Sequence, residues 1–286
     1  MKKSINAWCF QSHLSLEEIF KMATQSGFSA IELNMTEDKY NEGDIKDFGL
    51  ADNNYLTISM GEKEYSEILE LSKKYNIKIS GISTGLHWTY PLSSNDEDKR
   101  EKGKLIVRKM IECANFFKVD TILVVPGCTT KEVSYDVVYE RAKEAMNELK
   151  SYAEEKNVII GIENVWNKFL LSPLEAVQLL DEINSPYVKM YFDAGNVLQF
   201  GFPEQWVKIL NKRIAKVHIK DFDTSIGNIR GFKNLLEGNM DYKALLTALR
   251  EVGYDDYITA ELSPYNTAPY QLIENTSKAL EYIIKL

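Results

Sequence analysis

The sequence is poor in the residues that build disulfide-rich or thiolate-metal folds. It has only three cysteines, Cys9, Cys113 and Cys128, widely spaced and without a CxxC pair. Neither a disulfide scaffold nor a thiolate zinc site is therefore expected. Seven prolines and 15 glycines are too few for a collagen-like or Pro/Gly-rich disordered chain. Unpaired thiols are typical of a reducing compartment, so we expect a cytoplasmic protein.

Long apolar runs are also missing. No run approaches the roughly 18 apolar residues that predict a membrane span. The opening, MKKSINAWCF, has two lysines, but polar residues follow it in place of the apolar stretch of a signal peptide. We therefore expect neither a cleaved leader nor a membrane partner.

Positive charge is in deficit. The chain has 34 Lys and Arg against 42 Asp and Glu, a formal net charge of −8. A protein that binds duplex nucleic acid usually presents a basic face, so nucleic acid is not expected as a partner. What the chain does have is 286 residues, 44% of them hydrophobic, which is ample for a large core. Length alone leaves one or two domains open.

The chain alternates short β-branched runs with longer segments of helical period, a pattern that predicts βαβ units and a parallel sheet. Eight strands are expected, at 4–8, 28–33, 77–82, 121–125, 158–163, 188–193, 214–219 and 257–261. Eight helices are expected after them, at 16–25, 63–75, 96–117, 135–155, 173–183, 203–211, 242–252 and 269–284. Ser15, Ser172 and Asp241 stand where helix N-caps are expected, the two serines with Glu three residues later.

Eight strands, each followed by a helix, predict a single (β/α)8 TIM barrel over residues 1–286. The alternative, a doubly wound open sheet, would place a glycine-rich phosphate turn after the first strand, but no GxGxxG or GxxxxGK[ST] motif occurs. The polar, acidic segment 34–62 is too long for an ordinary turn of about 2–6 residues. Because it follows the C-terminal end of a strand, we expect this insertion on the active-site face, as a lid, a subunit contact or a solvated excursion.

Four residues with metal-binding side chains stand at the ends of four consecutive predicted strands: Glu163, Asp193, His218 and Glu261. Alone, each acid would more often serve in an ion pair or a turn, and the histidine in core packing. Neighbouring strands lie about 4.8 Å apart, so the four side chains can converge on one ion. Burying three carboxylates without a cation is costly. This donor set predicts one divalent metal ion, Mn²⁺, Zn²⁺, Co²⁺ or Mg²⁺.

Several runs of sequence carry a family resemblance. The runs GIENVWNKFLLSP, YFDAGN, VHIKDFD and ITAEL resemble the sugar isomerase and epimerase barrels of the xylose isomerase-like superfamily. The similarity is greatest to its L-ribulose-5-phosphate (L-xylulose-5-phosphate) 3-epimerase and hexulose-6-phosphate isomerase branch. The segments STGLHWTYPLSSNDEDKREKG and LLEGNMDYKALLTALREVGY resemble the same branch, so the resemblance covers nearly the whole chain.

The resemblance implies that Glu163, Asp193, His218 and Glu261 are the metal ligands, and that the two glutamates are also the catalytic acid/base pair. It implies 3-epimerisation or isomerisation of a ketose phosphate through a metal-stabilised cis-enediolate. Epimerisation needs a second carboxylate to return a proton from the opposite face, whereas aldose–ketose isomerisation can use one carboxylate as a shuttle. The expected partners are a small sugar or sugar phosphate and further copies of the chain, as a homo-oligomer (dimer or tetramer).

The sequence differs from two related families at residues that bear on the alternative activities. Endonuclease IV-like DNA-repair hydrolases bind three zinc ions with several additional histidines, but this chain has only His13 and His87 besides His218. Free-ketose 3-epimerases carry a histidine where Asn196 stands and an arginine where Thr224 stands. Both activities are therefore less favoured. An aldose–ketose isomerase, an inosose-type dehydratase and a catalytically silent sugar-binding barrel remain alternatives.

A wider set of polar and aromatic residues near strand ends is expected to contact the substrate: Trp8, Glu32, His87, Asn167, Asn196, Lys220 and Arg230. Lys220 and Arg230, with Lys233, flank the loop after the seventh strand, where barrels often bind phosphate. For three of the other residues, ordinary structural roles are alternatives. Trp8 suits core packing, Glu32 suits an ion pair or the orientation of His87, and His87 itself suits a surface loop.

Overall fold

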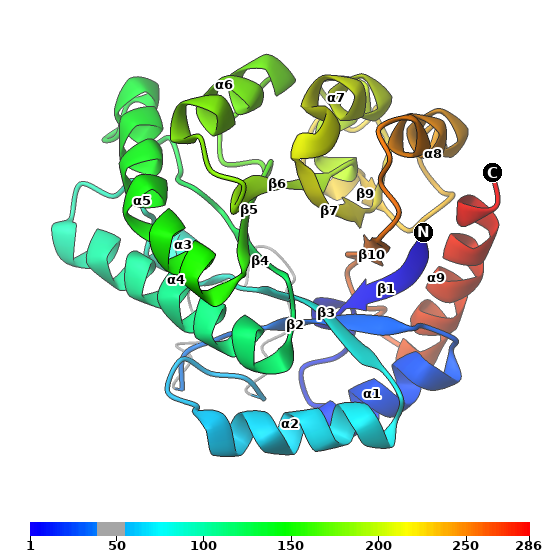
Figure 1. Ribbon diagram of the computed structural model, residues 1–286. Helices are drawn as coiled ribbons and strands as arrows, with labels where there is room; N and C mark the ends of the chain where they lie inside the picture. Colours follow the sequence, from blue (N-terminus) through cyan, green and yellow to red (C-terminus); the bar gives the residue numbers. More distant parts are fainter. Residues whose placement is uncertain (39–54) are drawn as a thin grey trace.

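The predicted barrel is present in the computed structural model of the protein, which describes residues 1–38 and 55–286. Eight parallel strands close into a barrel in the order β1-β10-β7-β6-β5-β4-β3-β2 (Figure 1). They are β1 (Lys2–Asn6), β2 (Ala30–Asn34), β3 (Lys78–Ser83), β4 (Thr121–Val124), β5 (Ile159–Glu163), β6 (Val188–Asp193), β7 (Ile214–Ile219) and β10 (Tyr257–Ala260). Their bounds agree with the predicted strands to within two residues at every end.

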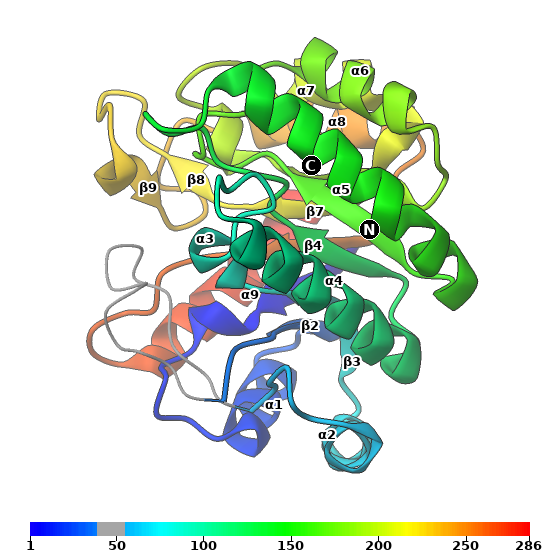
Figure 2. The same ribbon diagram turned by 90° about the vertical axis from the view of Figure 1, so that its left-hand side faces the viewer.

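Helices surround the barrel as an outer layer (Figures 1 and 2). They are α1 (Leu16–Gln25), α2 (Glu62–Lys74), α3 (Leu86–Thr89), α4 (Glu97–Phe117), α5 (Tyr135–Lys156), α6 (Pro173–Ile183), α7 (Pro203–Leu210), α8 (Tyr242–Glu251) and α9 (Pro269–Ile284). Their inward faces and the outward faces of the strands form one continuous hydrophobic core. Burial of this apolar area is the main force that holds the helices against the barrel. In the part of the chain described, none of these helices has both the length and the apolarity to cross a bilayer.

The predicted helix starts are confirmed by their hydrogen bonds. Ser15 accepts from the amide of Glu18, whose side chain accepts in return from Ser15, so α1 begins with a complete capping box. Ser172 caps α6 and Asp241 caps α8 through their side-chain oxygens. Each cap satisfies amides that the first helical turn leaves without partners.

The first strand lies slightly earlier than predicted. It was expected at 4–8, but β1 ends at Asn6, and residues Ala7–Cys9 form a 3-10 turn. The side chain of Asn6 accepts a hydrogen bond from the amide of Trp8 at 2.7 Å, which caps this turn. Trp8 therefore leaves the barrel wall just beyond the strand, on the same face as the other strand ends.

Two elements were not predicted, the short helix α3 and the hairpin β8 (Asp221–Phe222) with β9 (Phe232–Lys233). Figure 2 shows both at the same end of the barrel. Buried Asp221 anchors the hairpin, because its carboxylate accepts from the amides of Phe222 and Met240 and from the hydroxyl of Tyr242. Most of the predicted insertion 34–62, namely residues 39–54, lies outside the described residues; at its described flanks, Thr36 pairs with Thr57.

Candidate metal centre and active-site cavity

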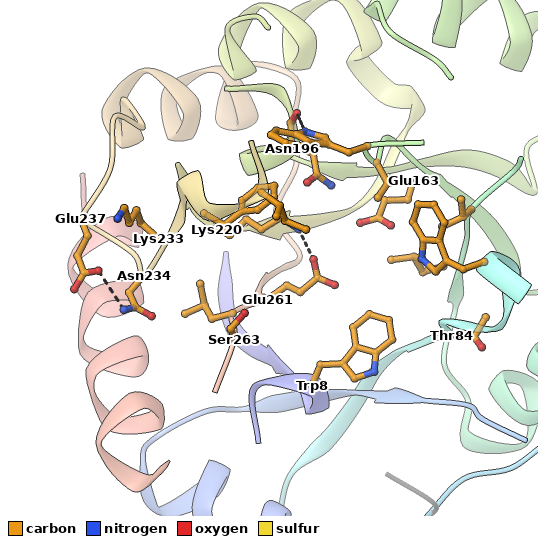
Figure 3. Close-up of a pocket in the computed structure, with 18 of the residues that line it drawn as sticks. Trp8, Thr84, Glu163, Asn196, Lys220, Lys233, Asn234, Glu237, Glu261 and Ser263 are labelled. Carbon is orange, nitrogen blue, oxygen red and sulfur yellow. Dashed lines mark hydrogen bonds and ion pairs between the residues drawn. The ribbon is translucent and has the colours of Figure 1, made fainter. Parts of the chain in front are cut away.

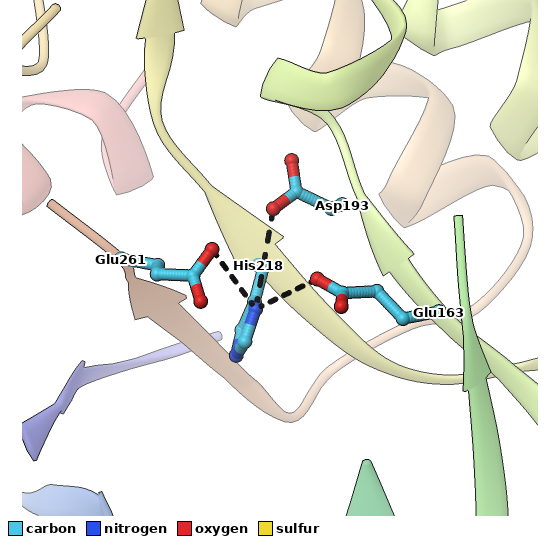
Figure 4. Close-up of side chains that lie close together, drawn as sticks. All are labelled: Glu163, Asp193, His218 and Glu261. Carbon is cyan, nitrogen blue, oxygen red and sulfur yellow. Dashed lines mark ion pairs between the residues drawn. The ribbon is translucent and has the colours of Figure 1, made fainter. Parts of the chain in front are cut away.

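The four predicted ligand residues meet at the C-terminal end of the barrel strands. Glu163 and Asp193 are the last residues of β5 and β6, His218 is the penultimate residue of β7, and Glu261 follows β10 directly. One donor atom from each lies within 4.8 Å of the other three (Figure 4). Because parallel neighbours in register end at the same level, as Asp193 does opposite His218, the topology alone brings these side chains together.

The imidazole of His218 lies at the centre of the cluster. Its Nδ1 atom is 3.5 Å from a carboxylate oxygen of Glu163, 3.8 Å from one of Glu261 and 4.0 Å from one of Asp193. The ring is fully buried, and Nδ1 has no hydrogen-bond partner within the described part of the chain. A buried nitrogen that points at three carboxylates without a hydrogen bond is the arrangement expected of a metal ligand.

Asp193 is held by the turn that follows β6. Its Oδ1 accepts from the amide of Asn196 at 2.8 Å, and its own amide donates to the side chain of Asn164 at 2.9 Å. The other carboxylate oxygen, Oδ2, accepts from the ammonium of Lys220 at 2.6 Å. The same ammonium also bonds Glu261, so Lys220 bridges two of the three acids.

The two glutamates have different electrostatic environments. Burial, followed by the nearby charge of Glu261, raises the pKa of Glu163 to about 7. Burial would also raise the pKa of Glu261, but the charges of Lys220 and His218 outweigh it and lower that pKa. Two carboxyl groups whose surroundings separate their pKa values are typical of acid/base sites.

The donor set fits a divalent cation. Burial disfavours a charged imidazole, yet the carboxylates of Glu32 and Glu261 outweigh this and raise the pKa of His218 well above its ordinary value. The cluster thus attracts positive charge strongly. Three carboxylates and one imidazole are donors that Mn²⁺, Co²⁺, Zn²⁺ and Mg²⁺ accept, with the oxygen-rich balance suiting the harder ions.

A cavity of about 350 Å³ opens beside this cluster (Figure 3). Glu163, Glu261, Asn196 and Lys220 border it on the side of the four-residue cluster, and Lys233, Asn234 and Glu237 border it further out. Much of the remaining wall is aromatic, from Trp8, Trp88, Trp166 and Phe232. A mostly apolar wall with a few polar groups is the usual make-up of a small-molecule site, and the size suits a sugar or sugar phosphate.

Three of the predicted substrate contacts line this cavity: Trp8, Asn196 and Lys220. The side-chain amide of Asn196 donates to the carbonyl of Asn164 at 3.0 Å, so it also ties the turn after Asp193. The ammonium of Lys220 forms ion pairs with Asp193 and Glu261 and does not stand free for a phosphate.

The other four predicted contacts are not among the residues that line the cavity. Asn167 is buried and holds its own loop, because its side chain bonds the carbonyl of Gly127 and the amide of Phe169. His87 is buried inside α3, and neither ring nitrogen has a hydrogen-bond partner within the described residues. Arg230 lies exposed in the turn Ile229–Gly231. Glu32 is fully buried and contacts His218, not His87.

Several lining residues were missed. Trp88 and Trp166 lie within runs that were recognised for their resemblance, and Ser263 comes two residues after Glu261. Their place just beyond strand ends was a signal that could have identified them. Phe232 and Asn234 come from or follow β9, a two-residue strand that leaves no periodic signal in the sequence.

Residues 20–286 match the family described as the xylose isomerase-like TIM barrel. The chain belongs to this family. The predicted resemblance is therefore confirmed, and it rests on nearly the full length of this xylose isomerase-like barrel.

Two curated relatives of this family member are named as sugar-phosphate epimerases. The putative L-ribulose-5-phosphate 3-epimerase SgbU of Escherichia coli (strain K12) is 24% identical over 254 residues, 84% of this chain and 81% of its own. The L-ribulose-5-phosphate 3-epimerase UlaE of Salmonella paratyphi A is 21% identical over 248 residues, 83% of this chain and 78% of its own. The expectation of an isomerase or epimerase agrees with these names.

Solved structures of other proteins have the same fold. A D-tagatose 3-epimerase-like protein superposes with a TM-score of 0.79 at 20% identity, covering 100% of this chain and 97% of its own. The D-psicose 3-epimerase of Clostridium cellulolyticum H10, solved with D-tagatose, gives a TM-score of 0.77 at 15% identity, covering 99% of both chains. At these identities the likeness establishes the barrel architecture alone.

Proposed function

We propose that the protein is a divalent-metal-dependent epimerase that inverts a ketose at the carbon next to its carbonyl group. One observation carries the proposal. Donor atoms of Glu163, Asp193, His218 and Glu261 converge within 4.8 Å, and both glutamates also line a cavity that suits a sugar. The names of the curated relatives, both L-ribulose-5-phosphate 3-epimerases, support the same reaction class.

The residues of the cluster and Lys220 would perform different parts of the proposed reaction. Glu163, Asp193, His218 and Glu261 would hold a divalent cation, which would supply Lewis-acid polarisation of the ketose carbonyl group. Glu163 and Glu261 approach the cluster from opposite sides (Figure 4), which suits removal of a carbon-bound proton on one face and delivery of a proton on the other. The ammonium of Lys220, bonded to Asp193 and Glu261, holds these two carboxylates in place.

The favoured substrate class is a ketose phosphate, bound with its phosphate towards Lys233. Of the three cations considered near this loop, Lys220 is engaged by carboxylates and Arg230 does not line the cavity. Lys233 does line it, and its positive charge, which after the hydrogen bonds from Ser225 also helps to lower the pKa of the Asp223 carboxyl, is a further cation at the cavity wall. A lysine ammonium at the wall of a cavity suits a phosphate group.

A free ketose is the second candidate. The aromatic wall of Trp8, Trp88, Trp166 and Phe232 offers apolar faces against which the C–H faces of a sugar can pack without any phosphate contact. The endonuclease-type alternative gains no support from the cavity, because neither His13 nor His87 lines it.

A panel of pentulose phosphates, hexulose phosphates and the matching free ketoses, incubated with Mn²⁺ in D₂O and followed by proton NMR, tests the proposal. We expect deuterium to enter at one carbon next to the carbonyl as the epimer forms, without loss of water from the sugar. Exchange with no epimer but with an aldose would indicate an isomerase, and loss of water would indicate a dehydratase. Either result would contradict the proposal.

The variant Lys233→Met separates the two substrate classes. It should raise KM for the active ketose phosphate by at least tenfold while changing KM for a free ketose little. An unchanged KM for the phosphate would contradict the proposed phosphate position and favour the free sugar.

A further inference from the structure

Glu32 is a fully buried carboxylate that does not line the cavity, so its role lies inside the barrel. Its Oε1 lies 2.9 Å from Nε2 of His218 and accepts from the side-chain amide of Asn6 at 2.5 Å. Its Oε2 accepts from the hydroxyl of Tyr191. Both carboxylate oxygens therefore have partners, which offsets the cost of burying the charge.

The strands around Glu32 leave space for its carboxylate inside the barrel. The pairing of β2 with β3 shifts register between Ile31 and Glu32, and the pairing of β6 with β7 shifts between Met190 and Tyr191. Such irregularities redirect side chains. In β3, a Cβ atom on Gly81 would lie 2.8 Å from the Glu32 carboxylate and 2.9 Å from the Tyr191 hydroxyl. Only glycine leaves room for the pair.

The contact decides which nitrogen of His218 carries a proton. The side-chain amide of Asn6 donates to Oε1 of Glu32 and the hydroxyl of Tyr191 donates to Oε2, so both oxygens of this carboxylate act as acceptors. An ionised carboxylate can only accept, so Nε2 of His218 must be the donor. The opposite nitrogen, Nδ1, then faces Glu163, Asp193 and Glu261.

We propose that Glu32 is a positioning residue for the metal centre: it fixes the orientation and tautomer of His218, so that the Nδ1 lone pair is presented to the cation. The inference rests on the proposed cation site. Outer carboxylates that hold a ligating histidine in this way typically contribute a factor of 10–100 to metal affinity.

Glu32→Gln makes the sharpest variant, because the side chain keeps its shape. Its amide has one acceptor oxygen and one donor NH2 group, so it can pair with Nε2 of His218 in either tautomer. The mutation thus removes the negative charge that selects Nε2–H, and it does so without opening a cavity. Ser80→Ala is the matched control, since Ser80 is also buried inside the barrel but bonds Ser4 and not the Glu32 group.

Two measurements on the full chain test the proposal. Calorimetric titration with Mn²⁺ should show affinity 10–100-fold weaker for Glu32→Gln, and an unchanged affinity for Ser80→Ala. Long-range ¹H–¹⁵N spectra of the Zn²⁺-loaded wild type, labelled at its three histidines, should show His218 protonated at Nε2. Wild-type affinity in Glu32→Gln, or a proton on Nδ1 in the wild type, would overturn the proposal.

The outcomes separate this inference from the proposed function. If the wild type binds neither Mn²⁺ nor Zn²⁺, the proposed metal-dependent function fails. The Nε2–H proton of His218 should still give a slowly exchanging downfield resonance in the metal-free wild type, and that resonance should shift upfield and exchange faster in Glu32→Gln, because the hydrogen bond to a carboxylate is lost. Should Glu32→Gln not fold, the wild-type spectra alone decide, because they report the tautomer directly.

Discussion

At the scale of single residues, His218 has two distinct sides. Nε2 faces the buried carboxylate of Glu32, and Nδ1 faces the three acids of the candidate metal centre. One ring thus connects the packed interior of the barrel to the cavity side. Removal of this ring should weaken metal binding more than it destabilises the fold.

The variant His218→Ala should therefore weaken Mn²⁺ binding by at least about a hundredfold, since loss of an outer partner alone typically costs 10–100-fold. Calorimetric titration and elemental analysis of the purified protein would measure this. His13→Ala, at an exposed position, is the control and should bind as the wild type does. Unchanged metal content in His218→Ala would contradict the proposed ligand set.

The buried imidazole of His87 should make the stability of the protein depend on pH. Burial lowers its pKa from 6.5 to about 4. Between pH 6.5 and pH 4, His87 is therefore protonated in the unfolded chain but neutral in the folded chain. Protonation thus favours the unfolded chain, and the free energy of unfolding decreases as the pH falls from 6.5 towards 4. At 1.36 kcal/mol per unit, the wild type should lose about 3 kcal/mol through this residue by pH 4.

Chemical denaturation of wild type and His87→Leu between pH 7 and pH 4 would measure that difference. The two free energies of unfolding should diverge as the pH falls, in favour of the variant, while exposed His13→Leu should follow the wild type. Parallel curves for wild type and His87→Leu would rule out the assignment.

The sequence alone predicted the convergence of those residues that stand at strand ends, while their role as metal ligands stays a prediction. Glu163 and Asp193 end apolar strands and Glu261 follows one, and closure of the barrel brings their side chains together. Sequence reasoning also named Glu32 but not its partner, because the contact with His218 depends on a register shift in the sheet. A one-residue irregularity of pairing leaves no mark in composition or periodicity.

At the scale of elements, the central strands show how the barrel interior accommodates the ring of Tyr191. Gly161 of β5 lies against it, and a Cβ atom there would lie 2.8 Å from the ring and 3.0 Å from the carbonyl oxygen of Ile122. A backbone oxygen in a sheet cannot move aside easily. Gly161 is therefore required by packing and not by its backbone conformation.

Gly161→Ala should destabilise the protein by about 1–3 kcal/mol through overpacking. Gly227→Ala, where no other heavy atom lies within 4 Å, should change stability by less than about 0.5 kcal/mol. Thermal or denaturant unfolding of both variants would measure the contrast. Equal stabilities would show that the barrel interior tolerates the extra methyl group.

The elements that escaped prediction are the short ones. The long strands and helices have strong periodicity and caps such as Ser15 and Ser172, and they were located well. The hairpin β8–β9 depends instead on tertiary anchoring by Asp221. Yet this hairpin supplies Phe232 and Lys233 to the cavity, so the least predictable element contributes to the proposed substrate contacts.

At the scale of the whole molecule, barrel closure turns residues far apart in sequence into neighbours. Glu32 and His218 are 186 positions apart and in hydrogen-bond contact. The acidic net charge of −8 gives no hint of this, because the acids of the site are a small part of the 42 in the chain. The homo-oligomer expected from the sequence stays a prediction.

Hydrogen exchange at the substrate is the decisive test of the acid/base role proposed for Glu163. Mn²⁺-loaded wild type and Glu163→Gln, matched in metal content, would be incubated in D₂O with the active ketose found by the panel, and deuterium at the carbon next to the carbonyl measured by NMR. We predict entry with the wild type and a rate at least about a hundredfold lower with Glu163→Gln, which keeps the fold but removes a carboxyl group. Exchange at the wild-type rate in the variant would contradict the account.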